Sequence, residues 1–236
     1  VPIAKMSGRG LGFTGGTVDK MESIPGFRTS LSPEEFLSQV NDIGISVIGQ
    51  TAHITPADKK LYALRDVTAT VDSFGLIASS IMSKKLAAGS DAIVLDVKVG
   101  DGAFMENHED ASVLANLMVK IGNNAGRRTA AAITEMGQPL GKAVGNSIEV
   151  IEAIETLKGK GPSDITHLAE KLSGIMVYLG GKAKTPEEGM EMTAAALRDG
   201  RGLAKFREFV RAQGGDPKVT EDYSVFPQHS LTKQLR

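Results

Sequence analysis

The apolar run at residues 91–99, DAIVLDVKV, sets the class of fold. It is nearly continuous before it alternates, which is typical of a strand that other elements cover on both faces in a parallel sheet. A helical pattern follows from residue 107 to about 124, with Gly126 just beyond it, and a second strand-like stretch occupies residues 127–134. The order strand, helix, strand predicts a βαβ unit and an α/β fold.

Capping signals mark the starts of further helices. Ser32 and Glu35 fit a capping box around Pro33, and we expect that helix to end near Asn41. Residues 57–88 follow a second cap-plus-proline signal and are predicted to be almost wholly helical. The other expected elements are strands at residues 1–5 and 45–48 and helices that begin at Asn146, Ser163 and Thr185 or cover residues 203–210. We interpret the proline-containing polar segment 215–228 as a linker or a peripheral tail.

Composition excludes several classes of function. The chain has no cysteine, so disulfides, thiolate nucleophiles and cysteine-ligated metals are excluded. Its formal net charge of −1 gives no general positive field for nucleic acid or for an anionic membrane. No apolar run approaches the roughly 20 residues that span a bilayer, and the first residues are no signal peptide. We therefore expect a cytoplasmic protein with no nucleic-acid or membrane partner, and the missing initiator methionine suggests a fragment.

A glycine-rich segment at residues 8–16 follows the first expected strand directly and holds five of the 27 glycines. Glycine lets backbone N–H groups converge on an anion, and the charged or hydroxyl side chains around it supply further donors to phosphate oxygens. These donors are Lys5, Ser7, Arg9, Thr14 and Thr17. A phosphate cradle is the favoured interpretation, and a glycine-rich surface turn is the alternative.

Two nucleotide-binding motifs fit this segment poorly. Residues 10–15 satisfy G-x-G-x-x-G, but a dinucleotide fingerprint needs a long helix straight afterwards, and Pro25 and Gly26 interrupt within three turns. A P-loop is excluded because Gly15 is followed by Gly16 where the motif requires lysine. A dehydrogenase is therefore a distant alternative.

Two further groups are candidates for binding. Ser80 and Lys84 are four residues apart in a helical stretch and share a face, and with Arg65 they could bind a polar planar ligand. From these residues alone, a solvated cationic face is the favoured interpretation. The irregular loop 138–146 has free carbonyls that, together with Glu152, suit a hard cation, although an ordinary loop is the simpler interpretation. The four histidines are scattered without metal-ligand spacing.

Three long blocks of sequence resemble the thymidine and pyrimidine-nucleoside phosphorylase family. The blocks are KMSGRGLGFTGGTVDKMESIPGF, GQTAHITPADKKLYALRDVTATVDSFGLIASSIMSKK and DAIVLDVKVGDGAFM, and the resemblance covers nearly all 236 residues. It implies a homodimeric, cytoplasmic glycosyltransferase that cleaves uridine, thymidine and deoxyuridine with inorganic phosphate, releasing the base and a pentose 1-phosphate. Lys5 resembles the pyrimidine-nucleoside enzymes more than typical thymidine phosphorylases.

The resemblance also assigns roles to residues of this chain. The family's phosphate ligands match Lys5, Ser7 and Thr17, and its base-binding residues match Arg65, Ser80 and Lys84. Of these, Arg65 and Lys84 are implied to be catalytic, because they are suited to stabilise the departing base. The family's potassium site matches Leu140 and Ala143, through their carbonyl oxygens, and Glu152, through its carboxylate.

The implied fold is a mixed, largely parallel sheet with flanking helices, plus a separate helical domain that carries the base site. Residues 1–56 and 88–236 correspond to the α/β phosphate-binding domain, and residues 57–87 to part of the helical, dimer-forming domain. Family chains continue at both ends, and the amino-terminal part holds a second phosphate loop with a histidine. We therefore expect the fragment alone to be inactive.

Two positions depart from the family pattern. Phe13 replaces a histidine in the glycine-rich segment, and Asp101 stands where a small residue is usual. Asp101 would repel phosphate if it pointed inward. A binding-only or assembly domain from a truncated phosphorylase is the main alternative to an enzyme.

Overall fold

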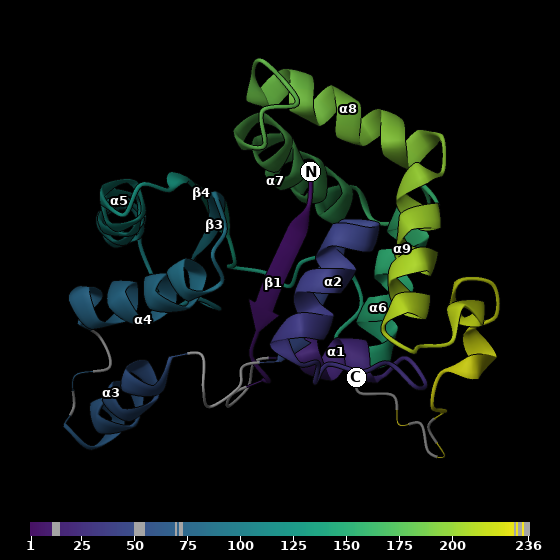
Figure 1. Cartoon of the computed structure of the whole chain (residues 1–236), viewed down its shortest axis with the longest axis horizontal. Coiled ribbons are helices and arrows are strands. Elements are labelled where there is room, and N and C mark those ends of the chain that lie inside the picture. Colours follow the sequence, from purple (N-terminus) through teal and green to yellow (C-terminus); the bar gives the residue numbers. More distant parts are fainter. Residues whose placement is uncertain are drawn as a thin grey trace.

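The computed structural model describes residues 1–10, 15–49, 55–68, 70, 73–228, 230 and 233, without the side chains of residues 59, 62, 63 and 65–67. Within these residues the chain forms strands and helices in alternation and is mostly helical after residue 145 (Figure 1). The strands are β1 (Ile3–Ser7), β2 (Ile45–Gly49), β3 (Ala92–Val99) and β4 (Arg128–Glu135). The helices are α1 (Thr17–Glu22), α2 (Pro33–Ile43), α3 (Pro56–Val67), α4 (Phe74–Ala87), α5 (His108–Asn124), α6 (Asn146–Leu157), α7 (Ser163–Leu179), α8 (Pro186–Arg198) and α9 (Arg201–Ala212), followed by the 3₁₀ turns η1 (Pro217–Thr220) and η2 (Tyr223–Val225).

The described strands form two parallel pairs. Strand β1 pairs with β2, from Ile3 opposite Ile45 to Ser7 opposite Gly49. Strand β3 pairs with β4 in the same sense, and α5 connects them. The α/β class and the parallel βαβ unit are confirmed, although the two pairs are separate sheets within the described residues.

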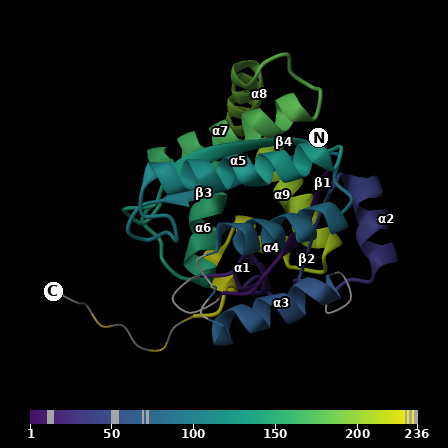
Figure 2. The same ribbon diagram turned by 90° about the vertical axis from the view of Figure 1, so that its left-hand side faces the viewer.

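Strand β3 is fully buried on one face and only partly covered on the other, so the prediction of two covered faces is confirmed in part. Its buried side chains, with Ile93 and Val99 at the two ends of the row, pack between α4 and α5. The opposite face carries Asp96, which is exposed and forms an ion pair with Lys98 at 2.8 Å. Figure 2 shows α4 and α5, which cover the buried face of β3, at the front of the molecule. The charged face of β3 is therefore available to line a cavity.

Strand β1 has one apolar and one polar face. Ala4 and Met6 pack against a small core around Phe36 of α2. Because side chains alternate along a strand, Lys5 and Ser7 lie on the opposite face of β1. The packing of α2 therefore turns the two predicted phosphate ligands away from this core.

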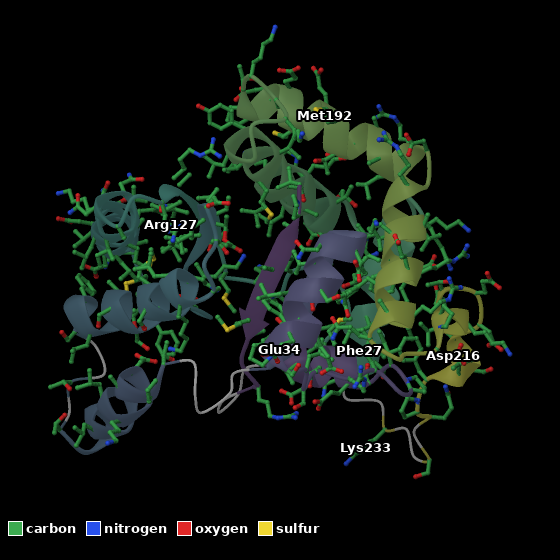
Figure 3. The ribbon with its side chains drawn as sticks, viewed as in Figure 1. Phe27, Glu34, Arg127, Met192, Asp216 and Lys233 are labelled. Atoms are coloured by element: carbon green, nitrogen blue, oxygen red, sulfur yellow. The ribbon has the colours of Figure 1, made fainter. Side chains whose placement is uncertain are left out.

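A second core joins the amino-terminal and carboxyl-terminal parts of the chain. The rings of Phe27 and Phe209 meet edge to face with centroids 5.3 Å apart. Figure 3 shows Phe27 in this core and Met192 on the outer side of α8. Val219 and Phe226, 0% and 2% exposed, belong to the same core. The interpretation of residues 215–228 as a linker or peripheral tail is therefore wrong for η1 and η2.

Most helix boundaries follow the capping signals. Ser32 Oγ accepts a hydrogen bond from the Glu35 amide at 3.1 Å, and Glu35 reaches back to the Ser32 amide at 2.8 Å. That helix continues to Ile43 rather than Asn41. Asn146 is not a cap, because Gly145 occupies the N-cap position with a φ of 144°. The helical prediction for residues 57–88 is confirmed where α3 and α4 lie. None of the helices described is long and apolar enough to cross a membrane.

Candidate functional site

A cavity opens where β1 and β2 end. Ser7, Gly8 and Arg9 line it together with Thr29 and the backbone of β2 at Gly49. Ser7 and Gly49 are register partners at the carboxyl ends of parallel strands, which is where α/β proteins commonly bind ligands. Thr14, a predicted phosphate donor, and Phe13 lie outside the described residues.

The two ends of the glycine-rich segment meet beside this cavity. A Cβ atom on Gly16 would lie 2.2 Å from the amide nitrogen of Gly10, so only glycine fits at that position. Thr17 follows directly as the first residue of α1 and is half-buried. The short α1, which ends at Glu22, agrees with the rejection of a dinucleotide fingerprint.

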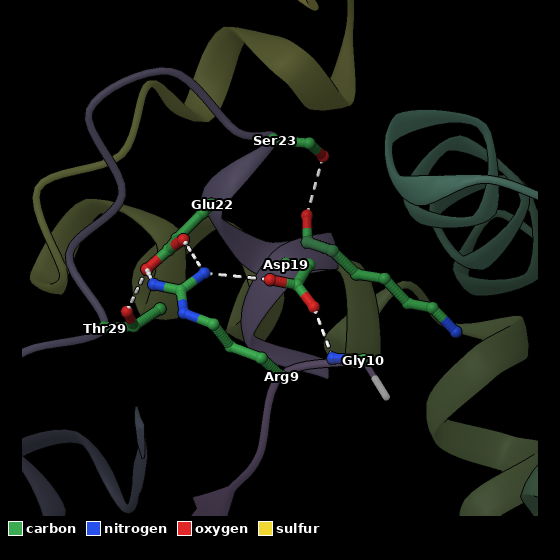
Figure 4. Close-up of polar contacts among 7 residues, drawn as sticks. Arg9, Gly10, Asp19, Glu22, Ser23 and Thr29 are labelled. Carbon is green, nitrogen blue, oxygen red and sulfur yellow. Dashed lines mark hydrogen bonds and ion pairs between the residues drawn. The ribbon is translucent and has the colours of Figure 1, made fainter. Parts of the chain in front are cut away.

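Two carboxylates engage Arg9, which opposes its predicted role as an anion donor. Its guanidinium group contacts the carboxylates of Asp19 at 2.8 Å and Glu22 at 2.6 Å (Figure 4). Asp19 also accepts a hydrogen bond from the Gly10 amide at 2.6 Å, and Thr29 Oγ1 donates to Glu22 at 2.5 Å. Arg9 therefore fastens the glycine-rich segment to α1.

The same contacts lower the pKa values of both carboxyl groups. For Asp19 the main cause is the hydrogen bond from the Gly10 amide, followed by the bond from Arg9. For Glu22 the bond from Arg9 comes first and the bond from Thr29 second. Both carboxylates remain ionised near neutral pH and neutralise the guanidinium charge.

Lys5 lines a second cavity, between β1, α4 and β3. Lys84 and Lys85 of α4 line the same cavity, and so does Asp96 of β3. Burial and the charge of Lys20 lower the pKa of Lys5. One predicted phosphate ligand and one predicted base ligand therefore share a cavity. Lys85 had no place in the sequence predictions, because nothing in the pattern of α4 distinguishes it from a surface lysine.

Ser80 and Lys84 share a face as predicted and are bonded to each other. Lys84 Nζ lies 2.9 Å from Ser80 Oγ and 3.0 Å from the Ser80 carbonyl oxygen. It also forms an ion pair with Asp58 of α3 at 2.7 Å. Ser80 is 6% exposed, so a solvated cationic face does not describe this pair.

Two further residues, Asp58 and Arg65, belong with Ser80 and Lys84 in the sequence predictions or in the structure, but not in both. Asp58 had no sequence signal beyond a favourable acidic residue in the first turn of α3. Arg65 lies on α3, and its side chain is outside the described part of the structure.

The third group surrounds the loop before α6. Glu152 accepts hydrogen bonds from the backbone amides of Lys142 at 2.9 Å and Ala143 at 3.3 Å. Asp164 holds the same loop through the Gly141 amide at 2.8 Å. Leu140 is 44% exposed, and it is absent from the residues that line the cavity at Glu152. Across the described residues, no cluster of three or more acidic or histidine side chains could hold a metal ion.

Asp101 lies in the turn after β3 and is exposed. It lines neither the cavity at Ser7 nor the cavity at Lys5. A repulsion between Asp101 and a bound anion therefore has no support in this arrangement.

Comparison with known proteins agrees with the resemblance in the sequence. Residues 1–203 match the family described as glycosyl transferase family, a/b domain. The pyrimidine-nucleoside phosphorylase of Geobacillus stearothermophilus is 59% identical over 235 residues, which are 100% of this chain and 54% of that protein. The pyrimidine-nucleoside phosphorylase of Bacillus subtilis is 58% identical over 228 residues, 97% of this chain and 53% of that protein. The chain spans about half the length of these curated relatives. It is a homologue of pyrimidine-nucleoside phosphorylases and belongs to the glycosyl transferase family defined by this a/b domain.

Proposed function

We propose that the protein carrying this chain catalyses reversible phosphorolysis of pyrimidine nucleosides in nucleoside salvage. Its substrates are uridine, thymidine and deoxyuridine with inorganic phosphate, and its products are the free base and ribose or deoxyribose 1-phosphate. The observation that carries this proposal is the 57–59% identity to pyrimidine-nucleoside phosphorylases over nearly the whole chain. The shared cavity of Lys5 and Lys84 supports it, because phosphate and base ligands must lie close together for a transfer between them.

The proposed reaction divides the site into two halves. A phosphate oxygen bonds to C1 of the pentose while the bond from C1 to the pyrimidine nitrogen breaks. The bonding electron pair leaves with the base, which takes up the proton that the attacking hydrogen phosphate gives up. The sugar gains positive charge and the base gains negative charge in the transition state, so cationic donors beside the base lower the barrier.

The two halves use different side chains. Lys5, Ser7 and Thr17 bind phosphate, whereas Arg65, Ser80 and Lys84 bind the base. Lys84 is held by Ser80 and Asp58, so its ammonium group needs little reorganisation when the negative charge develops. Arg65 is the second proposed donor to the departing base.

The division also describes the proposed domains. Residues 1–56 and 88–236 form the phosphate-binding domain, and residues 57–87 belong to a base-binding domain that also forms a homodimer interface. The chain spans about half the length of its relatives. We expect the isolated 236-residue chain to be inactive, and the complete protein to act in the cytoplasm.

Potassium is the proposed cofactor. The carbonyl oxygens of Leu140 and Ala143 and the carboxylate of Glu152 would hold it beside the loop before α6. Oxygen donors suit such a hard cation, and the Glu152 carboxylate already contacts this loop. Its effect would be structural, because an alkali cation is a weak Lewis acid.

The proposal is tested with the full-length protein. Uridine, thymidine and deoxyuridine are incubated with and without inorganic phosphate, and the base is separated from the nucleoside by chromatography. We expect base release only when phosphate is present. Release of base at the same rate without phosphate would indicate a hydrolase, and no release from any of the three nucleosides would overturn the assignment.

A further inference from the structure

The cavity between β1, α4 and β3 holds more positive charge than its own carboxylates neutralise. Its volume is about 370 Å³, and Lys5 and Lys85 enter its lining from different elements. Lys84 is a third ammonium group there, and it is already bound to Asp58 and Ser80. The charge balance of the cavity therefore depends on what faces the other two lysines.

Asp96 is the acidic side chain in the lining of this cavity, and it has other partners. Its Oδ2 atom pairs with Lys98 at 2.8 Å, and its Oδ1 atom accepts a hydrogen bond from Thr134 at 2.5 Å. Lys20, which adds to the repulsion at Lys5, is paired with Glu149. Within the residues that the structure describes, neither Lys5 nor Lys85 has an ion pair or a side-chain hydrogen bond.

The pKa values of Lys5 and Lys85 are both lowered in this cavity. Burial lowers the pKa of Lys85, and repulsion from Lys5 and Lys84 lowers it further. The main cause for Lys5 is also burial. Partly buried ammonium groups without counter-ions cost stability, and an anion that enters the cavity removes that cost.

We propose that Lys85 binds, together with Lys5, the phosphate group of the reaction, either as inorganic phosphate or as the ester group of the pentose 1-phosphate. This inference rests on the proposed function. Two ammonium groups that line one cavity match the charge of a phosphate dianion. Ser7, two residues along the same face of β1, lines the other cavity, at the end of the strand. Lys85 is thereby a phosphate ligand that neither the sequence pattern nor the family resemblance indicated.

The direct test is a calorimetric titration of the full-length protein with inorganic phosphate. Lys85→Gln removes the charge, Lys85→Arg keeps it, and Lys120→Gln removes an exposed lysine of α5 as a matched control. Loss of one charge-assisted bond predicts about 10- to 100-fold weaker phosphate binding for Lys85→Gln. We expect a change of only a few-fold for Lys85→Arg and none for Lys120→Gln. If Lys85→Gln bound both inorganic phosphate and ribose 1-phosphate with unchanged affinity, the proposal would be overturned.

A second titration with ribose 1-phosphate separates the two sources of the phosphate group. Weaker binding of inorganic phosphate alone would assign Lys85 to the incoming co-substrate. Weaker binding of the ester alone would assign it to the product, and weaker binding of both would mean that one position serves both. Each of these results supports the proposal.

Thermal unfolding shows whether Lys85→Gln loses phosphate binding because the protein no longer folds. Without phosphate, Lys85→Gln should melt at the same temperature as the unmodified protein or higher, because the substitution removes repulsion. Added phosphate should raise the melting temperature of the unmodified protein more than that of Lys85→Gln. A lower melting temperature without phosphate and an equal gain with phosphate would contradict the inference.

These measurements need no nucleoside, so their failure is distinct from failure of the proposed function. Base release, with affinities of Lys85→Gln for inorganic phosphate and for ribose 1-phosphate both unchanged, would remove Lys85 from the site and leave phosphorolysis standing. Weakened phosphate binding in a protein that releases no base would retain the anion site and overturn phosphorolysis.

Discussion

Substitutions of single residues, Lys84 and Thr17, distinguish the base half of the proposed site from the phosphate half. In the full-length protein, Lys84→Ala should lower kcat by about a hundredfold, because a donor to a developing negative charge contributes on the order of 3 kcal/mol. Thr17→Ala should mainly raise the KM for phosphate. A nucleoside whose base is a stronger acid should partly restore the rate of Lys84→Ala, since that leaving group needs less help.

The same nucleoside should not rescue Thr17→Ala to a comparable extent. Steady-state rates with nucleosides of graded leaving-group acidity measure the difference. Equal rescue of the two variants, or a defect in Lys84→Ala that excess phosphate alone removes, would show that the base and phosphate roles are assigned wrongly.

The lysines of the second cavity also predict a pH dependence. The folded-state pKa of Lys85 lies below the ordinary lysine value of 10.5, so between these two values the unfolded chain binds more protons than the folded one. Folding stability from this group therefore rises with pH through that window, and the repulsion is fully present below it. The stability advantage of Lys85→Gln in phosphate-free buffer should shrink as pH rises towards 10.5. Denaturant unfolding at several pH values checks this, and a pH-independent difference would refute it.

At the scale of elements, features set by neighbouring residues were easier to predict from the sequence than contacts between distant segments. The capping box at Ser32 and the apolar pattern of β3 depend on neighbouring residues, and both elements form where expected. Gln213 shows the opposite case. Its side chain is fully buried, donates to the Val47 carbonyl oxygen at 2.9 Å and accepts from the Val47 amide at 3.0 Å. No pattern around Gln213 indicates a partner so distant in the sequence.

The prediction that segment 215–228 is a linker or a peripheral tail fails because its core contacts are also with residues that are distant in the sequence. Its prolines and polar residues resemble those of a linker, and the apolar side chains that hold it in place are too widely spaced to form a periodic pattern. Phe226→Ala should therefore destabilise the protein by about 3–5 kcal/mol, as is usual for a buried phenylalanine. Phe104→Ala is the matched control, because Phe104 is 78% exposed and its loss should cost about 0.5 kcal/mol or less. Equal denaturation midpoints for Phe226→Ala and the unmodified protein would show that this segment does not contribute to the core.

The loop before α6 tests the proposed potassium site. Glu152→Gln should weaken activation by potassium, because it removes the negative charge that faces Ala143. Asp164→Asn changes another carboxylate that holds the same loop, at Gly141, and it should leave the potassium response intact. Rates measured against potassium concentration compare the two variants. An identical potassium response in Glu152→Gln and the unmodified protein would exclude Glu152 as a ligand.

At the scale of the whole molecule, the cleft arises from contacts that the sequence does not display. Sequence patterns identified Lys5 and Lys84 separately, and only the packing of α4 beside β1 and β3 brings both to one cavity. The same packing adds Lys85 to that cavity. The sequence does not show the two carboxylate partners of Arg9, because they become its neighbours only when α1 folds back on the glycine-rich segment. Partners within one helix, such as Ser80 and Lys84, were thus predictable from the sequence, and partners on different elements were not.

Transfer of phosphate to the sugar is the central claim, and labelled phosphate measures it directly. The full-length protein is incubated with uridine and isotopically labelled inorganic phosphate, and the labelled sugar ester and free uracil are both quantified. The account predicts one labelled ribose 1-phosphate for each uracil released, and formation of labelled phosphate and uridine when the products are supplied instead. Release of uracil with free ribose and no label in a sugar ester would contradict it.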